Sequence, residues 1–369
     1  MSNNPIGVYI HIPFCASKCP YCDFYSITAD EGLYDQYTNA VNKSIESWLA
    51  KLQRNVDTVY FGGGTPSVIG AGRLGSVLSL LNGYITEDAE ITVECNPSGV
   101  DREFFEGIRR AGANRISMGL QSAVDSERRA LGRRAGIKDA ANAIELARQS
   151  GFSNISLDLM LGIPGQTQKS LGESVDFCVK SNVTHVSAYI LKIEENTPFF
   201  SMQSTLALPG EDEQCELYLT ACDALNTAGY KQYEISNFSI RGLESRHNLK
   251  YWRCEEYLGV GCSAHSHIDG KRFYYNRDIS SFINGCAPVD DGYAGSAEEY
   301  IMLALRLTQG LTQAGFESRF GREIPRKIVE KAKEFESFGL AVCDENTIWL
   351  TARGFLVSNS IITELLMCM

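Results

Sequence analysis

The amino-acid sequence predicts an α/β protein whose core is a mainly parallel sheet covered by helices. Six short apolar or β-branched runs occur between residues 8 and 190, and amphipathic stretches of helical period separate most of them. Continuous apolar strands that alternate with helices are typical of a parallel sheet buried on both faces. Six such units fit either an open doubly wound sheet or an incomplete barrel, and periodicity does not distinguish the two.

In chain order, each apolar run is expected to form a strand and each amphipathic stretch a helix. The strands are expected at residues 8–12, 58–61, 91–93, 115–120, 155–160 and 185–190. The helices are expected at residues 34–52, 73–81, 102–111, 138–149 and 170–180. Residues 231–235 predict one further strand.

The alternation stops near residue 239, which predicts a change of domain. We expect residues 1–238 to form the β/α core, 239–296 an irregular connecting segment rich in glycine and aromatic residues, and 297–369 a small, mainly helical domain. The last part has helical patterns at 298–309, 324–338 and 356–367, with a short strand at 347–350. Such a unit is typical of a winged-helix-like domain.

The composition is that of an ordinary globular protein, with 44% hydrophobic and 21% charged residues, and it argues against a disordered, collagen-like or coiled-coil chain. The net charge of −11 argues against nucleic-acid binding. No apolar run approaches the roughly 18 residues of a membrane helix, and the start has no signal-like pattern. We therefore expect a cytoplasmic protein that is not an integral membrane protein.

Three of the twelve cysteines lie within eight residues: Cys15, Cys19 and Cys22. The other nine are scattered, as expected of small buried hydrophobic side chains. The clustered thiols follow the first predicted strand with the spacing C-x3-C-x2-C, which predicts three ligands to an iron–sulfur cubane whose fourth iron stays open. A zinc site would need a second Cys or His pair, and none stands out in the sequence.

This spacing after the first strand of a β/α chain resembles the radical S-adenosylmethionine (SAM) superfamily. The resemblance implies a 4Fe–4S cluster on the three cysteines, with the amino and carboxylate groups of SAM on the fourth iron. It also implies that an electron from the cluster cleaves SAM to a 5′-deoxyadenosyl radical. The implied fold is a partial (β/α)6 barrel, which decides between the two architectures left open above.

Longer motifs resemble the oxygen-independent coproporphyrinogen III oxidase group of that superfamily. They are Tyr9-Ile-His-Ile-Pro-Phe-Cys15, Gly62-Gly-Gly-Thr-Pro66, Glu94-Cys-Asn-Pro97, Gly119-Leu-Gln-Ser122 and Asp158-Leu-Met-Leu-Gly-Ile-Pro-Gly-Gln-Thr167. Together these motifs cover about half of the chain in the order that the group has. The match therefore extends well beyond the cysteine spacing.

Several residues in these motifs suit SAM chemically. A glycine triplet after a strand lets backbone N–H groups approach a carboxylate, and the guanidinium of Arg133 can pair with one. Glu94, Gln121 and Asp158 lie in or at the ends of three predicted strands, where a barrel gathers its site residues. The resemblance places the SAM contacts at Tyr9, Tyr21, Gly63, Gly64, Thr65, Glu94, Gln121, Arg133, Asp158 and Lys192.

Two features depart from the decarboxylating enzymes of the group. Phe24 stands where those enzymes carry a further cysteine, and the cysteine triad begins at residue 15 without their long N-terminal extension. Both features match the haem chaperone branch of the same group. That branch has a His-Asn-x-x-Tyr-Trp motif, to which His247, Asn248, Tyr251 and Trp252 correspond.

The resemblance implies that His247 supplies an axial nitrogen to haem iron, since imidazole is a common axial ligand and aromatic rings pack on a porphyrin face. His265 and His267 are a second possibility for this role. His11 is expected to orient the first strand, and His185 is expected in the core or at a strand end.

The sequence thus predicts a radical SAM protein that binds haem and transfers it to an acceptor protein. An electron donor such as flavodoxin is a further expected partner. The alternative function is an oxygen-independent coproporphyrinogen III oxidase, which abstracts hydrogen from propionate side chains and releases CO2. A structural module with a zinc knot is a third alternative.

Overall fold

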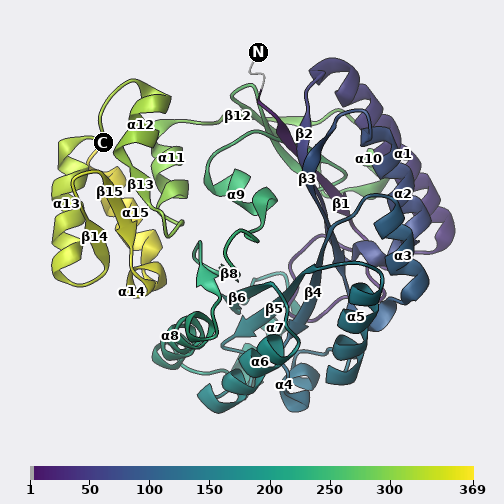
Figure 1. Ribbon diagram of the computed structural model, residues 1–369, viewed down its shortest axis with the longest axis horizontal. Coiled ribbons are helices and arrows are strands. Elements are labelled where there is room, and N and C mark those ends of the chain that lie inside the picture. Colours follow the sequence, from purple (N-terminus) through teal and green to yellow (C-terminus); the bar gives the residue numbers. More distant parts are fainter. Residues whose placement is uncertain (1–3) are drawn as a thin grey trace.

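The computed structural model describes residues 4–369 as an open, curved sheet with helices on its outer face and a smaller C-terminal unit beside it (Figure 1). The prediction about the start of the chain therefore falls partly outside the described residues. The sheet order is β12-β11-β10-β9-β1-β2-β3-β4-β5-β6-β8-β7, so β12 and β7 are its free edges. The sheet curves like a barrel wall that stays open between these edges.

Six central strands are parallel, and shorter strands extend the sheet on both sides. The parallel strands are β1 Ile6–Ile12, β2 Val56–Gly63, β3 Ile85–Cys95, β4 Arg115–Gln121, β5 Asn154–Leu161 and β6 His185–Ile190. The flanking strands are β7 Lys231–Gln232, β8 Asn237–Ser239, β9 Tyr257–Val260, β10 His265–Ile268, β11 Lys271–Tyr274 and β12 Val289–Tyr293. Of these, β9 runs parallel to β1, whereas β8 is antiparallel to β6.

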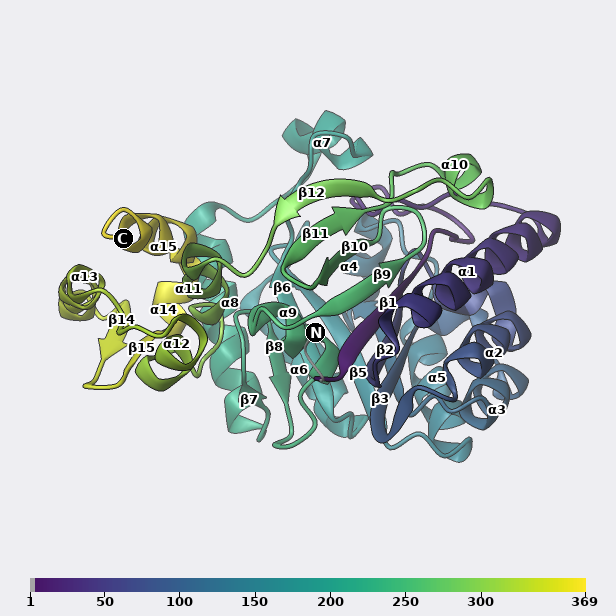
Figure 2. The ribbon, with the colours of Figure 1, turned by 90° about the horizontal axis from the view of Figure 1, so that it is seen from above.

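Most helices of the core cover the outer face of the sheet, as Figures 1 and 2 show. They are α1 Glu31–Leu52, α2 Gly70–Leu81, α3 Arg102–Arg110, α4 Asp125–Ala130, α5 Ile137–Gln149, α6 Gln168–Lys180, α8 Glu211–Thr227 and α10 Ile279–Ile283. Helix α7, Pro198–Met202, lies instead beside the loop after β1, where Phe199 N donates to Pro20 O over 3.0 Å. Single turns of 3-10 helix lie at η1 Pro66–Ile69, η2 Pro97–Gly99 and η3 Gln203–Thr205. The short helix α9, Arg246–Trp252, lies instead on the concave side of the sheet (Figure 1).

The two faces of the central strands differ in chemistry. In β1, Ile6, Val8, Ile10 and Ile12 are at most 1% exposed and belong to the main hydrophobic core under the helices. The alternate residues of the strands face inward, and in β3 to β5 many of these are polar, as for Glu94 and its counterparts on neighbouring strands. The continuous apolar strands expected from the sequence are therefore apolar on one face only, because the inner face builds a site.

The C-terminal unit combines helices with a small sheet of order β13-β15-β14. Its elements are α11 Ala297–Ala304, β13 Leu311–Thr312, α12 Gln313–Phe320, α13 Arg326–Ser337, β14 Ala341–Cys343, β15 Thr347–Leu350, α14 Ala352–Leu356 and α15 Ser358–Leu366. Backbone hydrogen bonds join it to the core: Ile235 N donates to Arg306 O over 2.9 Å, and Thr308 N donates to Tyr233 O over 3.1 Å. The C-terminal unit is thus bonded directly to the core in addition to being covalently linked to it.

All six expected strands and five expected helices of the first 190 residues are confirmed, with ends that differ by a few residues. The strand expected at 231–235 is shorter and forms an antiparallel edge pair of β7 with β8. The segment that the sequence predicts to be irregular contains β9 to β12 and extends the main sheet. Its strands are only four or five residues long, so glycine and aromatic residues dominate its composition and hide the alternation.

Candidate functional site

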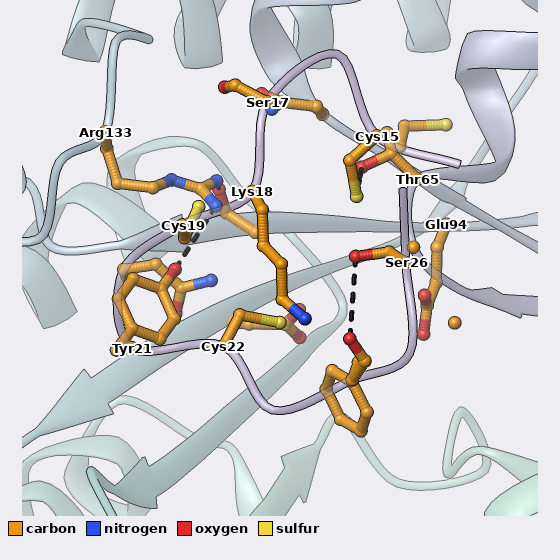
Figure 3. A pocket seen from close by; sticks show the side chains of 18 of the residues that line it. Cys15, Ser17, Lys18, Cys19, Tyr21, Cys22, Ser26, Thr65, Glu94 and Arg133 are labelled. Carbon is orange, nitrogen blue, oxygen red and sulfur yellow. Dashed lines mark hydrogen bonds between the residues drawn. The ribbon is translucent and has the colours of Figure 1, made fainter. Parts of the chain in front are cut away.

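The three clustered cysteines line one cavity at the carboxyl ends of the parallel strands. Cys15, Cys19 and Cys22 lie on the loop after β1, are partly exposed, and border a cavity of about 170 Å³. Their side chains surround the same space in Figure 3. The carboxyl ends of parallel strands are where α/β proteins place their sites, so the local sequence and the topology agree.

Short-range contacts hold this loop in place. Cys15 N donates to Ile27 O over 2.9 Å, so the loop returns beside its own start. Nε2 of His11 lies 3.0 Å from the carbonyl of Tyr25, and its Nδ1 lies 3.1 Å from the hydroxyl of Tyr9. Burial lowers the pKa of His11 to about 4, so the ring is neutral. His11 therefore ties β1 to the cysteine loop, which extends its expected role in orienting the strand.

The glycine triplet is required by packing as well as by any ligand. A Cβ on Gly64 would lie 2.5 Å from Phe14 O, and Gly63 has a positive φ of 110° with the His11 ring at 2.5 Å. No other residue fits either position. Both glycines and Thr65 line the cavity, and Thr65 Oγ1 lies 3.5 Å from Cys15 Sγ.

Two acids on the inner face of the sheet border the same cavity. Tyr60 OH donates to Glu94 over 2.8 Å, and Ser117 Oγ lies 3.5 Å from Asp158. Burial raises the pKa of Glu94 to about 7, and the Asp158 charge adds to that rise. Burial also raises the pKa of Asp158, against the lowering effect of its hydrogen bonds. The site thus holds two acids that a cationic ligand would favour in ionised form.

Arg133 and Gln121 line the cavity near the end of β4, beside Asp158. Arg133 donates to the carbonyl of Gly119 and lies 3.4 Å from the hydroxyl of Tyr21 (Figure 3). Gln121 is 5% exposed and has a positive φ of 68°, a strained conformation for a residue other than glycine. Its side-chain oxygen accepts from Tyr189 OH over 3.1 Å. The surrounding contacts therefore hold Gln121 in a backbone conformation that it would rarely adopt by itself.

The structure brings together eight of the ten predicted SAM contacts. Tyr21, Gly63, Gly64, Thr65, Glu94, Gln121, Arg133 and Asp158 all line the cavity. Tyr9 lies beneath it, with its ring 6.2 Å from that of Tyr60, and Lys192 is 81% exposed and paired with Glu194. Neither of these two residues borders the cavity.

Sequence reasoning missed other residues that line this cavity. They are Ser17, Lys18, Ser26, Cys95, Asn96, Ser117 and Tyr189. The period of two along a strand was the available signal for one of them, since Ser117 shares a face of β4 with Gly119 and Gln121. Tyr189 holds the corresponding position near the end of β6. Phe24, singled out in the sequence, is 68% exposed at the mouth.

The donor set fits a cluster better than a single ion. Three thiols from one loop face a shared space, and the guanidinium of Arg133 lies on its wall, where it can pair with a carboxylate. Within residues 4–369, no three His, Cys, Asp or Glu side chains are arranged to hold one metal ion. Three thiolates with one open corner match the ligand set of a 4Fe–4S cluster that takes an exchangeable fourth ligand.

The predicted haem motif forms helix α9 and its His247 is deeply buried. His247 is 1% exposed, with Nδ1 2.8 Å from Thr58 Oγ1 and Nε2 2.8 Å from Tyr251 OH. Its own N–H donates to Glu90 over 3.0 Å, which fixes the start of α9 on β3. Burial lowers the pKa of His247 to about 3, so the ring is neutral. Both ring nitrogens are thus in use, and iron ligation requires one of these contacts to break.

The other predicted haem residues lie in different surroundings. Asn248 and Trp252 are partly exposed, and the guanidinium of Arg306 lies 5.9 Å from the Trp252 ring. On β10, His265 is exposed and stacks on Tyr274 at 5.1 Å, whereas His267 is 3% exposed and borders a second cavity. The four residues of the motif and the two β10 histidines therefore do not share one pocket.

Full-length relatives decide the family. The chain is 34% identical over 369 residues to "Heme chaperone HemW" of Bacillus subtilis, which covers 96% of this chain and 97% of the relative. It is 35% identical over 382 residues to the protein of the same name from Mycobacterium tuberculosis, covering 99% and 96%. The chain belongs to the HemW family. Residues 9–178 match the model of the radical SAM superfamily, and residues 296–357 match that of the HemN C-terminal domain.

Among solved structures, the HemW-family chain is similar to coproporphyrinogen III oxidase (HemN) from Escherichia coli. The TM-score is 0.83 at 22% identity, over 99% of this chain and 89% of that one. This likeness confirms the fold expected from the sequence, a partial radical SAM barrel with a small C-terminal domain. Membership of the radical SAM superfamily assigns a 4Fe–4S cluster and SAM to the chain.

Proposed function

We propose that this HemW-family protein is a haem chaperone, which binds haem and passes it to an acceptor protein. One observation carries the proposal: end-to-end similarity to curated haem chaperones from distant bacteria, with identities of 30% or more. The cavity of the cysteine loop supports the radical SAM part of the function, because eight of the ten predicted SAM contacts line it.

Cys15, Cys19 and Cys22 are proposed as the protein ligands of the cluster. The cluster and SAM together supply one-electron chemistry at this end of the barrel. Glu94 and Asp158 accept from cationic or hydroxyl groups of SAM, while Arg133 pairs with its carboxylate. Gly63 and Gly64 line the cavity, but the N–H of Gly63 donates to Glu94 and that of Gly64 to Ile12 O, so these glycines supply space for the ligand.

We also propose His247, with Asn248, Tyr251 and Trp252, as a haem site. Iron can bind His247 only if one of the two hydrogen bonds of its ring breaks. The Tyr251 hydroxyl would have to leave Nε2 before iron could bind there. The alternative role of His247 is to hold α9 against β2 through Thr58. These two roles predict different effects of its removal.

The alternative function, coproporphyrinogen III oxidation, uses the same SAM cavity. Phe24 counts against it, because this exposed side chain stands at the mouth in the place of the cysteine of the resembled oxidases. We propose that no decarboxylation occurs above background.

Three further assignments belong to this proposal. The partly exposed cysteine loop can be reached by a reducing protein, so an electron donor such as flavodoxin is a proposed partner. The haem acceptor is a second protein. No helix formed by residues 4–369 is long and apolar enough to cross a bilayer. We place the protein in the cytoplasm on the grounds of its cysteine content and its family.

Haem transfer tests the proposal directly. The anaerobically reconstituted protein is loaded with one equivalent of haem and mixed with apomyoglobin, whose reconstituted spectrum reports arrival of haem. Haem-loaded serum albumin, which releases haem passively, is the control. We expect transfer to apomyoglobin to be faster from the chaperone than from albumin. Failure to bind haem, or transfer no faster than from albumin, would contradict the chaperone function.

A further inference from the structure

Tyr60 connects the cavity at the cysteine loop to helix α9, on the concave side of the sheet (Figure 1). Its hydroxyl donates over 2.8 Å to Glu94, which borders that cavity, whereas Tyr60 itself does not. Its ring stacks on the imidazole of His247 on α9, with 5.3 Å between the centroids and 29° between the planes. One side chain of β2 thus contacts a residue of each proposed site.

The packing around Tyr60 leaves its ring little room to move. The Tyr9 ring stacks on it at 6.2 Å and lies 6.4 Å from the ring of His247, so the three rings form one cluster. A Cβ on Gly62 would lie 2.9 Å from Cε1 of Tyr60 and 3.2 Å from Oε1 of Glu94. In an interior this closely packed, one ring can shift only if its neighbours shift too.

His247 must change its contacts before it can bind iron. In the described structure its Nδ1 and Nε2 each lie 2.8 Å from a hydroxyl, of Thr58 and Tyr251 respectively. The imidazole is also enclosed, because a Cβ on Gly7 would lie 3.1 Å from its Cε1. Iron ligation at either nitrogen therefore breaks one hydrogen bond and displaces the ring. The ring of Tyr60 then loses the contact with His247 that supports it.

The charge of SAM acts on the other contact of Tyr60. A cation in the cavity favours the ionised form of Glu94, and a hydrogen bond to an ionised acceptor is about twice as strong as one to a neutral acceptor. The stronger bond holds the Tyr60 hydroxyl, and with it the ring that packs on His247. SAM thus favours the state in which His247 keeps its hydroxyl partners, whereas haem iron favours the state in which it gives one up.

We propose that Tyr60 is a positioning residue through which SAM and haem oppose each other's binding. The inference rests on the proposed function, with His247 as the haem ligand, and adds regulation to it: SAM in the cavity promotes release of haem to the acceptor. Coupling between two binding equilibria is reciprocal, so haem lowers the affinity for SAM by the same factor. The two ligands need not touch, because His247 does not border the SAM cavity.

The test measures the Kd of SAM for the anaerobically reconstituted full-length protein by equilibrium dialysis, with and without saturating ferric haem. No reductant is added, so SAM is not cleaved. We expect haem to raise the Kd of SAM at least about fivefold, within the usual range for coupled sites. SAM should raise the Kd of haem, followed by the Soret band, by the same factor.

Tyr60→Phe removes only the hydroxyl that reaches Glu94 and keeps the ring on His247. In this variant each ligand should leave the Kd of the other unchanged, a readout that a merely structural role of Tyr60 would not move. Tyr293→Phe, at a tyrosine of β12 that is 88% exposed, is the matched control and should keep the wild-type coupling. Circular dichroism confirms that both variants are folded.

The outcomes separate this inference from the proposed function. If the wild type fails to bind haem or SAM, the proposed function itself fails. If it binds both and neither ligand changes the Kd of the other, the function stands and the coupling is wrong. If haem weakens SAM binding as much in Tyr60→Phe as in the wild type, the two ligands compete without Tyr60, and its proposed role is wrong.

Discussion

At the scale of the residue, burial raises the pKa of the Glu94 carboxyl to about 7. The raised pKa means that the carboxylate form grows as the pH rises through 7. SAM carries positive charge, so its binding should tighten between pH 6 and pH 8, by up to about tenfold. Glu94→Gln should remove most of this dependence. Equilibrium binding of SAM to the reconstituted protein measures it, with Glu87→Gln, an exposed glutamate of the same strand, as control.

The same shift affects stability with a defined sign. Between about pH 4.5 and 7 the folded protein holds a proton on Glu94 that the unfolded chain has released. The contribution of Glu94 to the free energy of unfolding therefore falls as the pH rises through this window. For the binding prediction, an identical pH profile of SAM binding in the wild type and in Glu94→Gln would show that Glu94 does not contact SAM.

The cysteine triad gives a second prediction at this scale. Replacing Cys15, Cys19 or Cys22 by Ala should abolish the visible thiolate-to-iron absorption and most of the bound iron, because each is proposed as one of the three protein ligands of the cluster. Cys215→Ser, a partly exposed cysteine on α8, should keep both. Iron and zinc analysis after anaerobic reconstitution measures the outcome. Full occupancy by zinc with no iron in the wild type would show that the cluster assignment is wrong.

At the scale of the element, α9 depends on its contacts with the inner face of the sheet. His247→Ala leaves the hydroxyls of Thr58 and Tyr251 without their partner, and we expect it to lower the free energy of unfolding by about 1–3 kcal/mol. His265→Ala, at the exposed first residue of β10, should change it by less than about 0.5 kcal/mol. Urea unfolding measures both variants.

The same variant separates the two roles of His247. Stability equal to that of the wild type, together with loss of the haem Soret band, would assign His247 to haem iron and not to the anchoring of α9. A destabilised variant that still binds haem with the wild-type Kd would support the structural role.

The element scale also shows what the sequence could and could not predict. Long strands and helices with strong periodicity were predicted correctly from residues 6 to 190, since each buries a full apolar face. Helix α9 was not predicted as a helix, because it has seven residues and its position depends on Glu90, 157 residues away along the chain. No local pattern encodes such a contact.

The candidate site follows the same division. Sequence motifs predicted eight residues that line the cavity at the cysteine loop, among them Glu94, Gln121 and Asp158, because strand ends converge in any barrel of this kind. They did not predict that Tyr9 lies below the cavity or that Lys192 points to solvent. The state of each imidazole depends on partners distant in sequence, such as Thr58 for His247, and only the folded chain shows it.

At the scale of the whole molecule, one hydrophobic core includes residues of both the barrel and the C-terminal unit, from Ile6 to Leu365. Backbone hydrogen bonds to Arg306 and Thr308 join the two parts as well. We therefore expect the apo-protein to unfold in a single calorimetric transition. Two resolved transitions, with residues 297–369 melting separately, would show that the C-terminal unit is an independent domain.

The central claim is that a radical SAM barrel with an intact SAM cavity serves haem delivery in this chain. The most direct measurement presents the anaerobically reconstituted, reduced protein with SAM and either haem or coproporphyrinogen III, side by side. We predict stoichiometric haem binding, seen as a Soret band, and no protoporphyrinogen IX above background. Formation of protoporphyrinogen IX with matching consumption of SAM, and no binding of haem, would contradict the account.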